Sequence, residues 1–93
     1  MAMYVTLFKY TGPIKGGGPE RFKKVQEIVA AENGKIHSVY GLLGAWDVVS
    51  IGEFSDTATA MRAVAKIGNL IGAQSHTMPA VERDEFLNLL AGL

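Results

Sequence analysis

Asp47 is the side chain in this sequence best placed for acid–base chemistry, because it directly follows an aromatic residue, Trp46, at a predicted turn. A carboxylate acts as a general base when burial raises its pKa, and it can equally orient a bound molecule. An indole ring stacks on aromatic ligands, and Tyr40 precedes the turn by a few residues. We therefore predict a ligand pocket lined by Tyr40, Trp46 and Asp47, with Asp47 as one candidate catalytic residue.

The same residues also have a purely structural interpretation. Aspartate is common at turns, because its carboxylate accepts hydrogen bonds from nearby backbone N–H groups. Of the two roles, the structural one is the more usual for an aspartate at a hairpin. Trp46 would then pack in the core, with its indole N–H bonded to a partner.

The two histidines, His37 and His76, are the other residues that can move a proton or bind a metal. They fall on predicted strands at opposite edges of the sheet, and no Glu-x-x-His or His-x-His spacing accompanies them. His76 is the second candidate catalytic residue and the better candidate haem ligand, although an ordinary exposed strand histidine is the commoner situation. The lack of cysteine excludes thiolate metal sites, and with the two histidines apart we expect no metal site and no cofactor.

A run of three glycines lies between Lys15 and Pro19. Its composition is similar to that of phosphate-binding loops, but it lacks the Gly-Lys-Ser/Thr ending of a Walker loop and the Gly-x-Gly-x-x-Gly spacing. A helix begins directly after it, and helix N-termini can hold anions through free N–H groups. We interpret residues 15–18 as a loop that could act as a lid over one end of the fold.

Strand and helix patterns alternate along the chain and predict the elements that must position these residues. Apolar alternation predicts strands over residues 3–10, 35–43, 46–54 and 74–81. Helical spacing predicts helices from Pro19 to Asn33-Gly34, from a Ser55-Asp56 cap to about Asn69, and over residues 84–90. The order β-α-β-β-α-β is that of a ferredoxin-like α+β domain, and we expect a single domain over residues 1–93 that ends in the short C-terminal helix.

The second and third strands are predicted to form a tight hairpin, because only Gly44 and Ala45 separate them. Gly44 takes positive φ without a Cβ clash, which suits the first central position of a type II′ turn. Pro79 in the fourth strand predicts an edge position, since proline has no N–H to donate to a neighbouring strand.

Both faces of the two central strands are apolar. In the first strand Met3, Val5 and Leu7 alternate with Tyr4, Thr6 and Phe8, and in the third Val49 and Ile51 alternate with Trp46, Val48 and Phe54. The helices of this fold cover one face of the sheet, so a monomer would have a polar second face. We therefore expect a second copy of the chain to cover that face, in a homodimer or higher homo-oligomer. The alternative cover is the C-terminal helix, folded back through its leucines.

Composition argues against two classes of partner. Nine basic and nine acidic residues balance to a net charge of zero, whereas nucleic-acid-binding domains carry a basic excess on one face. No apolar run approaches the roughly 20 residues that span a bilayer, and the start of the chain has no signal-peptide pattern. We expect neither nucleic acid nor a membrane as partner, and a cytoplasmic location.

Short motifs spread over nearly the whole chain carry a family resemblance. They are Tyr4-Val5-Thr6-Leu7, Ile14-Lys15 before Pro19 and Arg21, Tyr40 ahead of Gly44-Ala45-Trp46-Asp47, and Asp84-Glu85-Phe86. Together they resemble the GYD-domain family, which implies the dimeric α/β-barrel superfamily, in which ferredoxin-like units pair sheet to sheet. The Gly-x-aromatic-Asp turn is also similar to one in the effector-binding domains of leucine-responsive regulators, which bind small molecules at subunit interfaces. Trp46 stands where the family usually has tyrosine.

Three functions agree with these expectations, and the sequence leaves open whether the chain is an enzyme. The favoured one is a small-molecule-binding homodimer whose pocket lies near Tyr40, Trp46 and Asp47. The second, which the superfamily resemblance also includes, is a cofactor-independent oxygenase- or isomerase-like enzyme using the same cavity with Asp47 or His76 as base. The third is a structural oligomerisation module whose aromatic sheet face serves only self-association.

Overall fold

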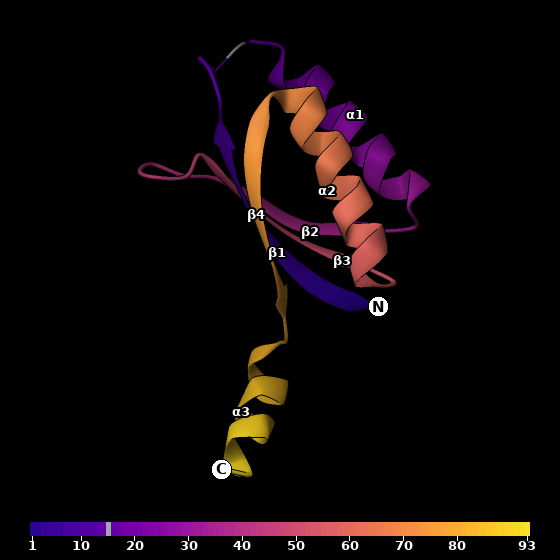
Figure 1. The fold of residues 1–93 in the computed structure, drawn as a ribbon, viewed down its shortest axis with the longest axis vertical. Coiled ribbons are helices and arrows are strands. Elements are labelled where there is room, and N and C mark those ends of the chain that lie inside the picture. Colours follow the sequence, from indigo (N-terminus) through magenta and orange to yellow (C-terminus); the bar gives the residue numbers. More distant parts are fainter. Residues whose placement is uncertain (15) are drawn as a thin grey trace.

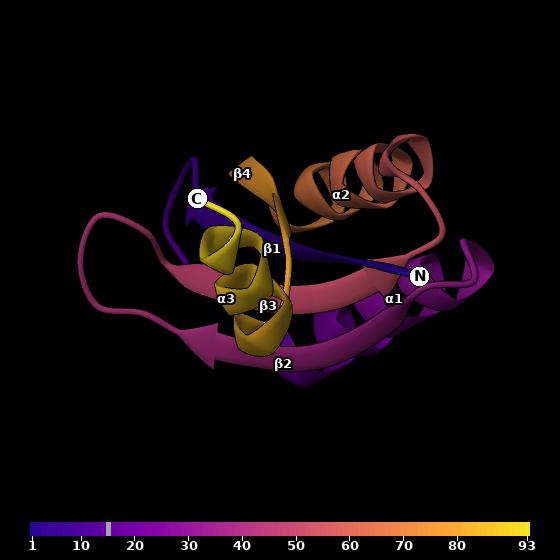
Figure 2. The same cartoon turned by 90° about the horizontal axis from the view of Figure 1, so that it is seen from below.

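The computed structural model describes residues 1–14 and 16–93. Its elements are β1 (Ala2–Tyr10), α1 (Gly18–Ala31), β2 (Lys35–Gly41), β3 (Val48–Phe54), α2 (Thr57–Ile71), β4 (Ala73–Ala80) and α3 (Arg83–Ala91). The strands form one antiparallel sheet in the order β2-β3-β1-β4, and α1 and α2 lie side by side against one face of it (Figure 1, Figure 2). This arrangement confirms the predicted ferredoxin-like α+β fold.

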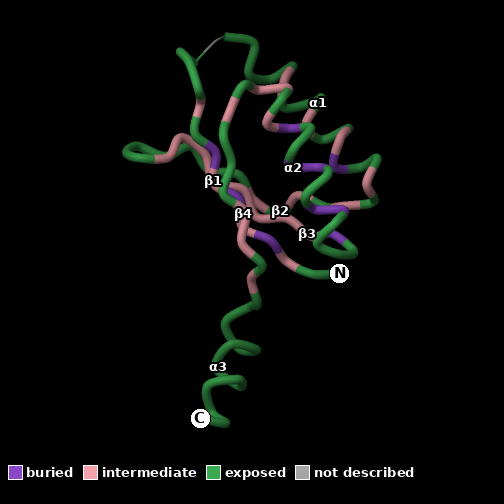
Figure 3. Tube along the Cα trace, viewed as in Figure 1, coloured by how far each residue is buried: buried purple, intermediate pink, exposed green. Residues whose placement is uncertain are grey.

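The core lies between the sheet and these two helices. Alternate positions of β1 and the end of β3 face the helices, where Tyr4, Phe8 and Phe54 are at most 6% exposed. Helix α2 contributes the small residues Ala60 and Ala63, which are 1% and 0% exposed, so its backbone approaches the sheet closely. Figure 3 shows the buried positions gathered on β1, α1 and α2 along this contact.

Helix α1 ends where the sequence predicts, at Asn33 and Gly34. Asn33 takes the left-handed conformation (φ 55°), and the Asn33 and Gly34 N–H groups donate to the carbonyls of Ala30 and Val29. A Cβ atom on Gly34 would lie 2.5 Å from the ring of Phe54, so this position requires glycine for lack of space.

Helix α2 also begins and ends as predicted. The Asp56 carboxylate caps it by accepting the Thr59 N–H at 2.8 Å, and Gly72 ends it with positive φ (70°). Hydrogen bonds from the side chain and backbone of Thr59 hold the pKa of Asp56 below its ordinary value of 3.8. At 15 residues α2 is the longest helix described, and no described helix has the length and apolar character that crossing a bilayer requires.

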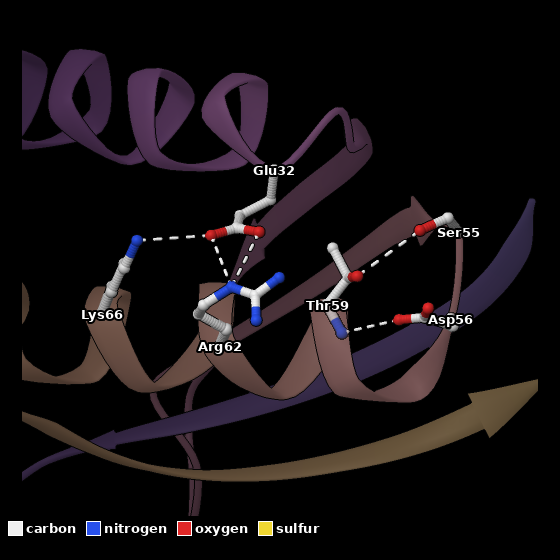
Figure 4. A network of polar contacts seen from close by, with 6 residues as sticks. All are labelled: Glu32, Ser55, Asp56, Thr59, Arg62 and Lys66. Atoms are coloured by element: carbon white, nitrogen blue, oxygen red, sulfur yellow. Dashed lines mark hydrogen bonds and ion pairs between the residues drawn. The ribbon is translucent and has the colours of Figure 1, made fainter.

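An ion-pair network joins the end of α1 to α2 (Figure 4). The Glu32 carboxylate accepts from Arg62 Nε at 2.9 and 3.0 Å and from Lys66 Nζ at 3.3 Å. The hydrogen bond from Arg62 is the largest cause that holds the pKa of Glu32 below its ordinary value of 4.5, with Lys66 adding to it. The network therefore adds to the contact between the two helices while Glu32 is ionised.

Replacing this carboxylate is expected to make helix packing less dependent on pH. Because the folded-state pKa of Glu32 is depressed, its stabilising effect is present above pH 4.5 and is lost as the pH falls through the lower folded-state value. Glu32→Gln should therefore melt at a lower temperature than the wild type near pH 7, and the difference should shrink as the pH is lowered below 4.5. Thermal unfolding followed by circular dichroism over this pH range measures the change, with Glu27→Gln on exposed α1 surface as control; a difference that does not vary with pH would contradict the role.

The opposite face of the sheet has no helix over it in the described part of the chain. The strand register places Val5 opposite Ile51 and Leu7 opposite Val49, and all four side chains are half-buried. These residues alternate with core-facing ones, so the sequence prediction of two apolar faces is confirmed. We call this surface, formed by Met3, Val5, Leu7, Val49 and Ile51, the open face.

Helix α3 does not cover the open face. It extends away from the body of the molecule beyond the end of β4 (Figure 1) and packs against none of the other described helices or strands. Phe86, Leu87 and Leu89 are each at least half exposed. The alternative in which its leucines fold back over the open face is therefore not the arrangement found.

Candidate functional site

The connection between β2 and β3 is longer than the predicted two-residue turn. Residues 42–47 form a loop that projects beyond the ends of the strands (Figure 1, Figure 2). The predicted strands 35–43 and 46–54 with a type II′ turn between them are therefore too long, although Gly44 does take positive φ (137°). Consequently Trp46 and Asp47 belong to the loop and not to the sheet.

Bonds to β1 give the loop its shape. Lys9 Nζ donates to the Ala45 carbonyl at 2.9 Å, while the Leu42 N–H closes the loop on the Asp47 carbonyl at 2.8 Å. The Asp47 N–H donates to the Phe8 carbonyl at 2.8 Å. The length of this loop therefore depends on hydrogen bonds to β1, a strand distant in sequence. Local turn preferences contain no information about such bonds.

The Asp47 carboxylate is occupied by a backbone contact. Its Oδ2 atom accepts the Tyr10 N–H at 2.8 Å, at the end of β1. This is the bonding expected of the structural interpretation, with the N–H supplied by the neighbouring strand. Asp47 consequently ties the loop to the sheet through both its backbone and its side chain.

Removing this acceptor is expected to destabilise the chain. Asp47→Ala leaves the half-buried Tyr10 N–H without its charged partner, so the free energy of unfolding should fall by about 1–2 kcal/mol. Asp47→Asn keeps an acceptor oxygen and should lose less. Urea unfolding of the three proteins measures the order; an alanine variant as stable as the wild type would show that the contact contributes nothing.

Trp46 lies against His76 and not in the core. The two rings meet edge to face, with centroids 5.9 Å apart and planes at 60°. His76 is directly opposite Leu7 in the β1–β4 register, on the side of the open face. The prediction that Trp46 points with Val48 and Phe54 is therefore wrong, because strand alternation does not extend into the loop.

Tyr40 lies apart from this pair. It is on β2, at the opposite edge of the sheet from β4, where it faces Val49 and is 60% exposed. Three strand spacings, about 14 Å, separate the backbones of the two edges. The structure thus brings Trp46 together with His76, and Tyr40 lies on the opposite edge strand. A ligand role for Tyr40, Trp46 and Asp47 stays a prediction.

The other residues that the sequence analysis singled out are His37 and the loop at residues 15–18. His37 is on β2, the other edge strand, with Nε2 3.2 Å from Glu53 Oε1, which confirms that the two histidines occupy opposite edges. Within the described residues no group of three or more His, Cys, Asp or Glu side chains is arranged to hold a metal ion. Of the loop predicted at residues 15–18, Lys15 lies outside the described residues, while Gly17 takes positive φ (79°) immediately before α1.

A cavity of about 210 Å³ lies on the helix side of the sheet, between the sheet and helices α1 and α2. Its walls are mainly apolar and include Phe8, Phe22, Val25, Val29, Val64 and Ile67. The lining residues whose side chains can form hydrogen bonds are Tyr4, Thr6, Tyr10, Arg21 and Ser50. Neither Tyr40, Trp46, Asp47 nor His76 lines it.

Ser50 is one of the polar residues of this cavity that were not among the site residues predicted from the sequence. Thr6 pairs with Ser50 on one side and Thr77 on the other, so a row of hydroxyls crosses the helix-facing side of the sheet. The Thr6 and Thr77 hydroxyls bond to each other at 3.0 Å, whereas the hydrogen bonds of the described residues include none from the Ser50 side chain. The available signal was a serine at a core-facing position of a central strand, where an apolar residue is usual.

A more polar groove of about 400 Å³ adjoins the cavity. It lies among the end of β1, the residues that follow it and the carboxyl end of α2. Tyr10, Arg21 and Ile71 line both spaces. An apolar chamber therefore meets an open polar groove at these three residues.

Comparison with known families identifies the family of this chain. The sequence model of the GYD domain matches residues 4–90. This chain belongs to the GYD domain family. The motifs that resembled the family in the sequence therefore identified it correctly, and no curated protein sequence matches this GYD domain.

Solved structures that resemble this GYD domain share its fold at low identity. They include the leucine response regulatory protein of Mycobacterium tuberculosis (TM-score 0.67, 10% identity, 87% of this chain and 51% of that one). They also include a protein from Thermus thermophilus (TM-score 0.57, 20% identity, 88% of this chain and 95% of that one). A third is the prephenate dehydratase of Staphylococcus aureus (TM-score 0.59, 13% identity, 82% of this chain and 28% of that one). The chain thus spans about half the length of the regulator, and these likenesses show the fold alone.

Proposed function

We propose that this GYD domain binds a small molecule in the cavity between the sheet and helices α1 and α2. The observation that carries the proposal is the cavity itself, about 210 Å³ with mainly apolar walls and Ser50 among its lining residues. Sites for small molecules have this composition, in which apolar walls supply affinity and a few polar groups orient the ligand.

The size of the cavity supports occupation by a ligand. Protein interiors are otherwise close-packed, so a space of this size between a sheet and two helices can admit a molecule larger than water. Since an apolar cavity of about 150 Å³ accepts benzene in another protein, this cavity suits a compound built on one ring or a short chain.

We propose in addition that two copies pair through the open face. Its side chains are apolar, and the described elements of the chain leave them without a cover. Apolar surface gains about 25 cal/mol for each Å² removed from water. A two-fold pair covers the same strip on both copies at once, and the resemblance to the GYD family implies that arrangement.

The two alternative functions have less in their favour. Asp47 and His76, the candidate bases of an enzyme, do not line the cavity, and the Asp47 carboxylate already accepts the Tyr10 N–H. A module that serves only assembly needs its open face and has no use for a cavity on the helix side. Neither alternative makes use of the cavity beside Ser50.

A thermal-shift screen tests the binding proposal. The panel contains one-ring aromatic and short aliphatic compounds in neutral, anionic and cationic forms. A compound present at about 100 times its Kd stabilises the folded state by about 2.7 kcal/mol, which corresponds to a rise in Tm of roughly 10 °C or more. A panel in which no compound raises Tm would contradict the proposal.

Two variants locate the site in the same screen. Asp47→Ala and Tyr40→Ala change residues predicted from the sequence to bind the ligand, and neither residue lines the cavity. Each should keep the full rise in Tm relative to its own unliganded value. Loss of the shift in either variant would place the ligand at the hairpin and contradict binding in the cavity.

A further inference from the structure

We infer that the preferred ligand is a small anion with an apolar body, such as an aromatic or short aliphatic monocarboxylate. The inference rests on the proposed function, because it names the class of molecule that the cavity takes. The observation behind it is the distribution of charged residues around the cavity and the groove. Among the described residues that line the cavity and the adjoining groove, Arg21 alone carries a formal charge.

Arg21 lies at the boundary between the two spaces. It is in the first turns of α1 and half-buried, whereas the neighbouring cations Lys23 and Lys24 are exposed and line neither space. Tyr10 lies at the same boundary and adds a phenolic hydroxyl. A molecule whose apolar body fills the chamber therefore presents its other end to a guanidinium and a hydroxyl.

These groups match a carboxylate. A guanidinium has five N–H donors in a planar fork, so it can bind both carboxylate oxygens and still serve other acceptors. The amino-terminal end of α1, whose first residue Gly18 also lines the cavity, adds partial positive charge. An ammonium group would meet repulsion from both, and a neutral group would gain only ordinary hydrogen bonds.

The carboxyl end of α2 lies on the groove side of the boundary and carries partial negative charge. There the Gly72 carbonyl accepts from the Thr11 N–H at 2.9 Å and from the Thr11 hydroxyl at 3.0 Å. These bonds reduce the negative potential that this carbonyl presents to the groove. The favoured position for an anion is consequently on the α1 side, at Arg21.

Three compounds that share a benzene ring and differ in charge test the inference. Benzoate, benzyl alcohol and benzylammonium are titrated by calorimetry into the wild type, Arg21→Gln and Lys23→Gln. The wild type should bind benzoate at least about tenfold more tightly than the other two, the ratio expected of one charge-assisted contact. Arg21→Gln should lose this preference and keep its affinity for benzyl alcohol, while Lys23→Gln, which alters an exposed cation on the same helix, should behave as the wild type.

The outcomes separate this inference from the proposed function. If benzyl alcohol binds the wild type as tightly as benzoate does, or if Arg21→Gln keeps the preference, the selection for anions is overturned while binding in the cavity stands. If the screen finds ligands but none of them is an anion, the inference is likewise overturned. If no compound of any charge binds, the proposed function itself fails.

Discussion

A single aspartate at the centre of the open face is expected to convert the proposed homodimer into a monomer. Leu7 lies between Val49 of β3 and His76 of β4, so in a sheet-to-sheet pair its side chain faces the partner. Burying an unpaired carboxylate there costs several kcal/mol, which raises the Kd of the pair at least about 100-fold. Light scattering at micromolar concentration should give the mass of two 10.0 kDa chains for the wild type and of one chain for Leu7→Asp.

The matched control places the same charge on the other side of the molecule. Met61 on α2 is 66% exposed and distant from the open face, so Met61→Asp should remain a dimer. Leu7→Ser supplies a milder test should the aspartate variant fail to fold. A monomeric wild type, or a folded Leu7→Asp that stays dimeric, would contradict pairing through this face.

Filling the cavity is expected to abolish ligand binding without unfolding the chain. Val25 on α1 lines the cavity and is half-buried, so the indole of Val25→Trp has room to occupy the space that a ligand would use. A ligand excluded from this space loses several kcal/mol of apolar burial, and its affinity should fall at least about 100-fold. The unliganded variant should melt at or above the wild-type Tm, because added apolar contacts replace unfilled space.

Calorimetric titration of a compound found in the screen measures this loss. Met61→Trp adds the same indole to exposed surface and should bind as the wild type does. Val25→Phe, which fills less of the space, should give an intermediate loss. Wild-type affinity in Val25→Trp would show that the ligand binds elsewhere.

The elements of the fold were predictable because their signals are local. Asp56 caps α2, Asn33 and Gly34 end α1, and Pro79 lies on an edge strand, each for reasons that neighbouring residues supply. Alternation along β1 likewise predicted two apolar faces. Such features depend on backbone chemistry within a few residues, so a single sequence contains them.

The hairpin was mispredicted because its partners are distant in sequence. Lys9 and Tyr10 of β1 bind Ala45 and Asp47, and these bonds make the turn a longer loop. The Trp46–His76 contact likewise depends on β4 lying beside β1. Local turn propensity has no information about either strand.

The cavity was missed for a related reason. Helical spacing predicted the helix that carries Val25 and Val29, but the space beside Ser50 depends on how the sheet, α1 and α2 pack together. Side-chain volumes summed along one helix do not reveal such a void. The sequence signal that did exist, a hydroxyl row through Thr6 and Ser50 in the core-facing pattern, points to the same place.

Nuclear Overhauser contacts between a bound compound and the protein test the central claim most directly. The measurement uses a ring compound from the screen and methyl-labelled protein. Binding in the cavity predicts contacts from the ring protons to the methyl groups of Val29, Val64 and Ile67, which line the space between the helices and the sheet. Contacts to the rings of Tyr40 and Trp46, without any to these methyl groups, would contradict it.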